Sequence, residues 1–206
     1  IVLKGNQLFD DVTGNFDSIT STLFDGGENA TVKSSGTKNE KSDSGLAPMA
    51  SVFVEQELGT GVTVGLDLMP YSAKIGSGSM DKDDDAETSG TNKVDVNFKN
   101  HVTLYAEIPT DLGGIDGGFI KVGIHRVSLE TDEVLSTGST YGDETLNGVM
   151  LAIGYEADMG GTFARVEANW MEIGGETFTS TNNSDNKIVV EDIDGYGVRL
   201  SIGKTF

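Results

Sequence analysis

The two histidines, His101 and His125, are the side chains of this sequence best suited to acid–base chemistry near neutral pH. A lipase or deacylase would pair such a histidine with a serine, and the stretch HRVS places Ser128 three residues after His125. Residues three apart on an extended strand point to opposite faces, so these two side chains do not form a pair on one strand. We therefore interpret both histidines as polar structural residues and expect neither an enzyme nor a cofactor.

The acidic stretch MDKDDDAE, residues 80–87, is the second candidate for chemistry because it carries carboxylates at alternate positions. These are Asp81, Asp83, Asp85 and Glu87. A calcium loop would add a glycine for the sharp turn and a bidentate acid at a fixed distance, and both are missing. The stretch is more typical of a solvated acidic loop, and weak binding of divalent cations is the alternative that stays open.

Composition excludes several classes of protein. The 206 residues include 33 acidic and 14 basic side chains, a formal charge of −19, which is opposite to the basic footprint of a nucleic-acid-binding protein. The absence of cysteine excludes disulfides and cysteine-based metal sites, and no apolar run approaches the ~20 residues of a membrane helix. The length suits one domain, 1–206. The start at Ile1, without methionine, resembles a processed N-terminus, and whether an export signal preceded it is left open.

Alternation of apolar and polar residues with period two recurs along the chain and predicts strands. The ranges are 49–58, 62–69, 93–108, 119–129, 147–157, 162–172 and 196–206. A first strand supplied by 1–9 or by 15–24 brings the count to eight. The apolar phase of 93–108 persists through the polar KNH, which predicts one long strand. The phase of 119–129 slips near Arg126, which predicts a bulge there.

The connections between these strands alternate between short and long. Short or moderate connections fall at 59–61, 109–118 and 158–161, and long polar ones at 10–47, 70–92, 130–146 and 173–195. In an up-and-down meander every second connection lies at the same end. With strands of ~10 residues, this pattern predicts an all-β, eight-stranded antiparallel up-and-down transmembrane β-barrel with four long loops on one rim.

The orientation of the two strand faces decides between a membrane barrel and a soluble one, because both alternate. The polar phase is rich in glycine and carries charges of both signs, which suits a crowded interior in which buried charges must be paired. We therefore predict a set of lumen charges: Glu55, Asp67, Lys121, Arg165, Glu167 and Arg199. The apolar phase then faces lipid, and Tyr155 and Trp170 are candidates for an interfacial aromatic girdle.

The stretch YGVRLSIGKTF, residues 196–206, resembles the terminal strand of bacterial outer-membrane barrels, which end on an aromatic residue preceded by alternate apolar residues. Phe206, Ile202, Leu200 and Val198 match this pattern, whereas Lys204 departs from it. The whole layout resembles the small eight-stranded barrels of the OmpA, OmpX and opacity type. It also resembles uncharacterised small barrels of marine bacteria that share STYG…LNG and an SIGK-F end.

This resemblance implies a porin-like protein of the Gram-negative outer membrane, with extracellular loops and both termini periplasmic. It implies contact with outer-membrane lipid and lipopolysaccharide and recognition of the last strand by the barrel assembly machinery. The acidic stretch 80–87 leaves divalent cations open as further partners. We expect a non-enzymatic cell-surface protein that presents acidic loops. Whether it also forms a narrow pore is not determined by the sequence. The alternative is a soluble all-β structural subunit of a surface layer, filament or virion. The oligomeric state is not determined by the sequence.

Overall fold

The computed structural model describes residues 3–7, 30–34, 37–41, 49–82, 90–114, 116–134, 140–181, 187–190 and 192–205, and every regular element among them is a strand. In chain order these are β1 (Leu3–Gln7), β2 (Ala30–Ser34), β3 (Thr37–Lys41), β4 (Val52–Glu57), β5 (Thr63–Met69), β6 (Ala73–Lys82), β7 (Gly90–Pro109), β8 (Gly118–Val134), β9 (Glu144–Asp158), β10 (Thr162–Ile173), β11 (Glu176–Thr179), β12 (Lys187–Val190) and β13 (Ile193–Thr205). None of the described segments is a helix with the length and apolar character needed to cross a membrane.

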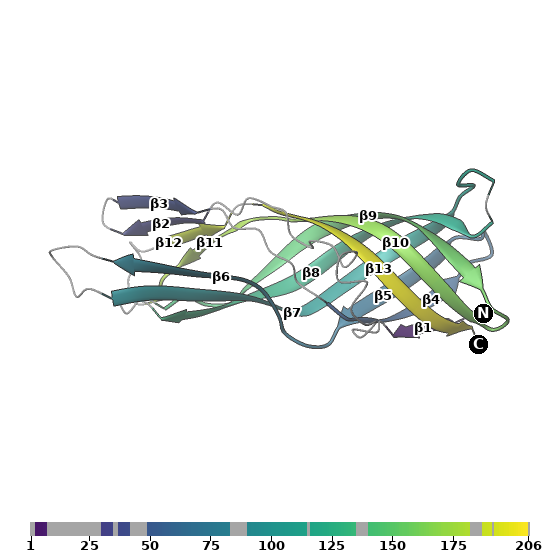
Figure 1. Ribbon diagram of the computed structural model, residues 1–206, viewed down its shortest axis with the longest axis horizontal. Coiled ribbons are helices and arrows are strands. Elements are labelled where there is room, and N and C mark those ends of the chain that lie inside the picture. The colour runs from purple at the N-terminus through teal and green to yellow at the C-terminus, as the bar shows by residue number, and fades with distance from the viewer. Residues whose placement is uncertain are drawn as a thin grey trace.

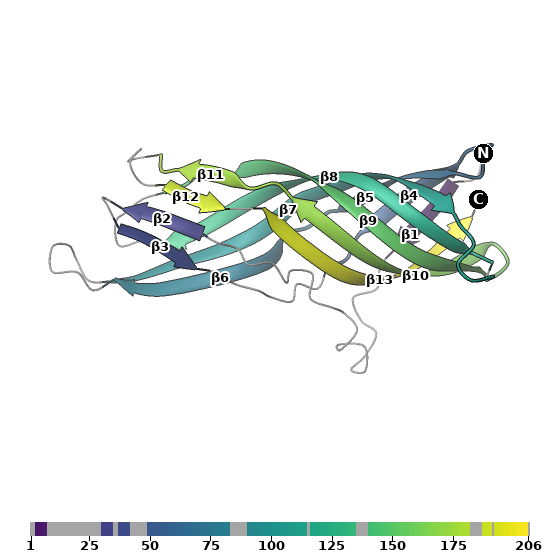
Figure 2. The ribbon, with the colours of Figure 1, turned by 90° about the horizontal axis from the view of Figure 1, so that it is seen from above.

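Seven strands form a curled antiparallel sheet with the form of a half-barrel, which is consistent with a β-barrel. Its order of pairing is β4, β5, β7, β8, β9, β10, β13. The short strand β1 pairs with β4 on one side and with β13 on the other. Figures 1 and 2 show the strands inclined to the long axis of an elongated molecule. The all-β prediction is confirmed. Of the two candidate first strands, 1–9 contains β1 and 15–24 lies outside the described residues.

All four predicted long loops contain strands, and the range 10–47 holds β2 and β3, so their interpretation as irregular loops was wrong in part. The range 70–92 holds β6, which pairs with an extended β7, and β8 continues to Val134. The range 173–195 holds β11 and β12, which join β2 and β3 in a separate four-stranded sheet. Both sheets extend to the end of the molecule opposite β1 (Figure 1). An alternation signal is weak in these strands because both of their faces carry polar residues.

The predicted bulge near Arg126 was placed on the wrong strand. β8 pairs residues 118–129 with residues 155–144 of β9 in continuous register. The irregularity lies opposite, on β7 between Lys99 and Val102, where Asn100 has a φ of 53°. The extra residue reverses the face of β7, so that Phe98 points into the molecule while Leu104 points out. An unbroken apolar phase in the sequence therefore serves two opposite faces.

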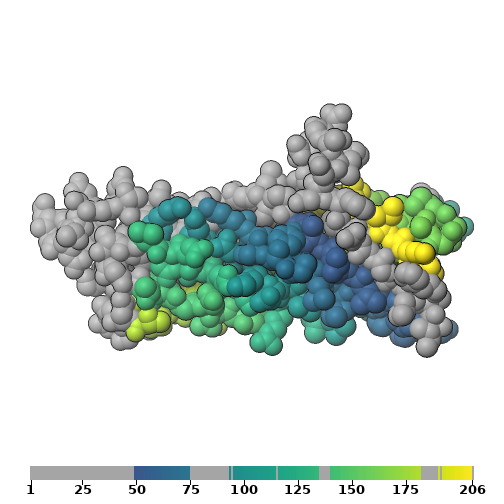
Figure 3. Space-filling view, turned by 90° about the horizontal axis from the view of Figure 1, so that it is seen from below, coloured from purple at the N-terminus to yellow at the C-terminus, as the bar shows by residue number. Residues whose placement is uncertain are grey.

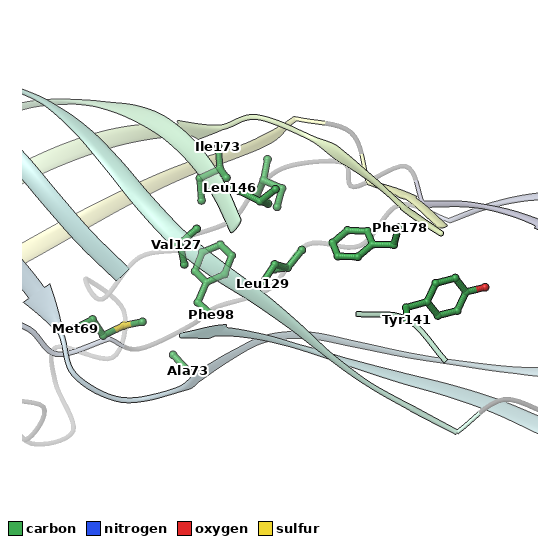
Figure 4. Close-up of a cluster of buried hydrophobic side chains, with 10 residues drawn as sticks. Met69, Ala73, Phe98, Val127, Leu129, Tyr141, Leu146, Ile173 and Phe178 are labelled. Atoms are coloured by element: carbon green, nitrogen blue, oxygen red, sulfur yellow. The ribbon is translucent and has the colours of Figure 1, made fainter. Parts of the chain in front are cut away.

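β6, residues 90–99 of β7, residues 128–134 of β8 and the four-stranded sheet are called the extension. An apolar core lies where the curled sheet passes into this extension. Its buried members are Met69, Ala73, Phe98, Val127, Leu129, Tyr141, Leu146, Ile173, Phe178 and Ile193. Figure 4 shows Phe98 of β7 beside Val127 of β8, with Tyr141 and Phe178 further along the extension. This core coincides with the phase slip of β8: its inward positions carry the polar Lys121 and His125 before the slip and the apolar Val127 and Leu129 after it.

The faces of the curled sheet are inverted relative to those of a water-soluble protein. The aliphatic residues Val52, Leu66, Leu104 and Leu200 are 38%, 37%, 54% and 40% exposed. By contrast, Glu55 and Lys121 are each 1% exposed. On the face shown in Figure 3, β4 and β5 (blue) lie beside β7 and β8 (teal and green), and the outward aliphatic side chains belong to these neighbouring strands. The predicted orientation of the two phases therefore agrees with the structure.

Candidate functional site

Charged side chains gather inside the curled sheet because each occupies an inward position of its strand. All six predicted lumen charges lie there, together with two further glutamates. The eight residues are Glu55 on β4, Asp67 on β5, Glu107 on β7, Lys121 on β8, Glu156 on β9, Arg165 and Glu167 on β10, and Arg199 on β13. Seven strands thus contribute to one buried network.

Arg165 is the centre of the network. Its two terminal nitrogens donate to the two carboxylate oxygens of Glu55 at 2.7 and 3.1 Å. The same guanidinium lies 3.2 Å from Glu107 and donates to Glu156 at 2.5 Å. The hydroxyl of Tyr105 donates a further hydrogen bond of 2.6 Å to Glu55. Such multiple charge-assisted bonds offset the cost of removing these groups from water.

Lys121 and Arg199 extend the network across the interior. The Lys121 ammonium donates to Glu167 at 2.5 Å and lies 3.6 Å from Glu107. Arg199 pairs with Asp67 and lies 3.8 Å from Glu167. Because Glu107 and Glu167 each face two cations, the three cationic side chains belong to one continuous system.

Aromatic rings pack against these cations. The guanidinium carbon of Arg165 lies 5.1 Å from the ring centre of Phe119 and 5.2 Å from that of Phe163. The Lys121 ammonium lies 4.5 Å from the ring centre of Tyr105. At these distances the ring faces attract a cation, and they exclude water from the charge pairs.

The network carries an excess of negative charge. Three cations, Lys121, Arg165 and Arg199, meet the five carboxylates of Glu55, Asp67, Glu107, Glu156 and Glu167, a formal balance of 3 − 5 = −2. Two of the carboxylates also line a cavity of about 680 Å³ at the mouth near the short turns, beside other acidic residues. The acidic lining comprises Glu57, Glu107, Asp111, Asp116, Glu156 and Asp158. The arrangement can hold the walls together and favours cations at this mouth.

Sequence reasoning missed Glu107, Glu156 and Tyr105. The signal was present in the strand phase, since Glu107 and Tyr105 alternate with Leu104 and Ala106 in 93–108. Glu107 and Glu156 lie close to the strand ends, where a carboxylate is more often solvated, so the phase alone did not single them out.

The two histidines come together on the inward face. Their ring centres are 5.2 Å apart, and the Nε2 of His125 is 3.1 Å from the carbonyl oxygen of Glu172. Ser128 lies on β8 three residues after His125, on the opposite face of the strand. Within the described parts of the chain, no group of three or more His, Cys, Asp or Glu side chains is arranged to hold a metal ion.

The remaining predicted residues lie on β6, on β13 or outside the described residues. Asp81 belongs to β6, whereas Asp83, Asp85 and Glu87 lie outside the described residues. On β13, Leu200 and Ile202 face outward at 40% and 41% exposure, with Val198 on the same face, and Phe206 lies outside the described residues.

No known protein-family model matches the chain, and no curated protein is significantly similar to it.

Proposed function

We propose that the curled sheet closes into an eight-stranded barrel and that this barrel spans the outer membrane of a Gram-negative bacterium as a non-enzymatic surface protein. The pairing pattern supports closure. β1 joins the two ends of the curled sheet, because it pairs with β13 and with β4. With β1 included, each of the seven strands of the curled sheet has a partner on both sides. Closure leaves no free sheet edge, which the hydrocarbon core of a membrane requires.

The observation that carries this proposal is the inversion of the two faces. Aliphatic residues are exposed on β4, β5, β7, β8, β9, β10 and β13, so the apolar surface extends around the sheet rather than forming one patch. A water-soluble monomer rarely exposes apolar patches beyond a few hundred Å². A belt of aliphatic side chains around a charged interior is the expected arrangement for a strand barrel in lipid.

The extent of the belt fits a membrane. Its outward apolar residues fall within 102–108, 149–155, 164–170 and 196–202 on four of the strands. At one end of the belt the outward positions become polar, as at Arg126 on β8 and Asn147 on β9, which are directly opposite each other and both exposed. With the flanking residues, these ranges approach the roughly 9–11 residues that a tilted strand uses to cross a bilayer.

In this proposal the short turns face the periplasm and the extension faces outward, where acidic segments meet divalent cations and lipopolysaccharide. Val198, Leu200 and Ile202, together with Phe206, form the signal recognised by the barrel assembly machinery. The role is not that of an open pore, because buried pairs such as Arg165–Glu55 and the apolar core with Phe98 occupy the interior.

Trp170 provides a direct test because it is the one tryptophan of the sequence and lies on the outward face of β10, opposite Leu151. In vesicles of brominated lipid we expect its fluorescence to be quenched strongly. A control variant, W170F/V134W, moves the probe to the exposed end of β8 and is expected to escape quenching. Equal quenching of the two probes, or none of Trp170, would contradict the membrane proposal.

Two further measurements separate the alternatives. A protein that stays monodisperse in buffer without detergent would favour the soluble structural subunit, in which a protein partner covers the apolar belt. Large steady currents across bilayers that contain the protein would contradict the non-porin part of the proposal while leaving the membrane location intact.

A further inference from the structure

Sulfur and imidazole side chains form a layer where the charge network meets the apolar core, and one of them, Met69, belongs to that core. The layer comprises Met69 on β5, His101 on β7, His125 on β8, Met150 on β9 and Met171 on β10. The strand register makes these residues neighbours around the wall. Met69 is directly opposite His101, and Met150 is directly opposite Met171. His125 is opposite Gly148 and therefore diagonal to Met150.

The hydrogen bond of His125 fixes which of its nitrogens carries a lone pair. A carbonyl oxygen only accepts, so the Nε2 of His125 donates its proton to Glu172. Its Nδ1 is then the unprotonated nitrogen of the neutral ring, and it is buried without a hydrogen-bond partner. Histidines that bind metals characteristically donate the other ring N–H to a backbone carbonyl in this way.

His101 supplies a second buried imidazole nitrogen. Its Nε2 is also buried without a hydrogen-bond partner. The two ring centres are 5.2 Å apart. Two imidazoles that bind one metal ion at metal–nitrogen distances of about 2 Å have ring centres roughly 5 to 6 Å apart. The spacing of His101 and His125 therefore matches a shared ion, which would satisfy both nitrogens.

The surroundings favour a soft, singly charged ion. Met69, Met150 and Met171 are 2%, 8% and 6% exposed and, with His101, line a cavity of about 90 Å³. Thioether sulfur prefers Cu(I) to hard divalent cations, and imidazole binds copper as well. The cavity is also lined by Arg199, but this cation is already paired with Asp67 and faces Glu167.

We propose that this layer is a buried Cu(I) site. The two imidazoles of His101 and His125 hold the ion, and thioethers of Met69, Met150 and Met171 complete its coordination. The inference follows from the donors and the register and does not depend on the membrane location.

The test is a titration of the folded full-length chain with Cu(I) in ascorbate, in competition with a chromophoric Cu(I) chelator. We expect one equivalent of Cu(I), bound at least 10- to 100-fold more weakly by H101N and by M150L/M171L. The control is M159L, which removes an exposed thioether in a turn and leaves the affinity unchanged. Binding of less than half an equivalent, or the same affinity in all variants, would overturn the site.

A spectroscopic measurement on the unsubstituted protein guards against variants that fail to fold. X-ray absorption at the copper edge is expected to show both nitrogen and sulfur neighbours. A spectrum with oxygen and nitrogen neighbours alone would contradict the thioether ligands and indicate adventitious surface binding.

Discussion

The guanidinium of Arg165 on β10 and the carboxylate of Glu55 on β4 form a two-point ion pair, although 110 residues separate them in the chain. Neither side chain exposes any surface. In the order of pairing, β1 and β13 lie between the two strands, so this pair joins parts of the wall that share no backbone hydrogen bonds. The interior of the curled sheet is therefore held by charges where a soluble barrel would use aliphatic packing.

Replacement of Arg165 by methionine should destabilise the protein strongly, because it leaves the carboxylates of Glu55, Glu107 and Glu156 without their shared cation. A loss of about 3–5 kcal/mol in the free energy of unfolding is expected. R165K should be intermediate, since lysine keeps the charge but loses the two-point geometry. Denaturant unfolding followed by circular dichroism measures both.

The control for this prediction is K99M, which breaks an ion pair with Glu130 whose side chains are 47% and 25% exposed. An exposed pair of this kind contributes at most about 1 kcal/mol. If R165M unfolds at the same denaturant concentration as K99M, the buried network does not stabilise the sheet.

An arginine introduced on the outward face tests the proposed lipid contact. L151R places a charge at a position that is 48% exposed on β9 and directly opposite Trp170. In lipid vesicles we expect a cost of about 2–4 kcal/mol, because the charge enters the apolar part of the bilayer. V134R, at a residue 69% exposed in the extension, should cost close to nothing. Similar unfolding of the two variants in vesicles would argue against lipid at Leu151.

Gly154 is expected to tolerate no side chain. A Cβ at this inward position of β9 would meet the ring of Phe119 and the backbone oxygen of Val166. Because the neighbouring strand cannot withdraw, G154A should destabilise by about 1–3 kcal/mol. At Gly142 an added Cβ meets nothing within 4 Å, so G142A is the matched control. Equal thermal stability of the two variants would show that the interior has room at Gly154.

Asn100 should be replaceable by glycine but not by valine. Its φ of 53° is in the left-handed region, which asparagine and glycine adopt readily and β-branched residues avoid. We expect N100G to be near neutral and N100V to lose about 1–3 kcal/mol. Amide hydrogen exchange along β7 would locate the effect. If the amides of Phe98 and Leu104 are as well protected against exchange in N100V as in the original chain, the bulge does not set the face of β7.

Stability of the β6–β7 hairpin should fall in acid. Hydrogen bonds from Lys74 and then Lys93, at 2.9 and 3.0 Å, hold the pKa of Asp95 below its ordinary value of 3.8. A lowered carboxylate pKa stabilises the folded state above pH 3.8, and this contribution disappears as the pH falls through the lower folded value. The protection of the hairpin amides against hydrogen exchange, relative to an unfolded chain at the same pH, should therefore fall below pH 3.8. It should fall less in D95N. An unchanged pH profile in D95N would contradict this assignment, as would insensitivity to salt.

The sequence by itself determined the strand class and the division of residues between two faces. Alternation in 147–157 and 162–172 identified β9 and β10 to within three residues at each end, because each strand has one apolar and one polar or small face. The same phase identified Arg165 and Glu167 as inward residues. Charges of both signs on a glycine-rich phase are informative because a buried charge requires a partner.

Tertiary structure decided what the phase alone leaves open. The partners of Arg165 come from β4, β7 and β9, and no local pattern specifies which strands meet across the interior. The bulge at Asn100 reversed one face of β7, and the extension turned polar segments into paired strands. Register and face depend on hydrogen bonds between residues far apart in the chain, whereas alternation depends only on nearest neighbours, so the sequence specified the strands and the fold specified their inner surface.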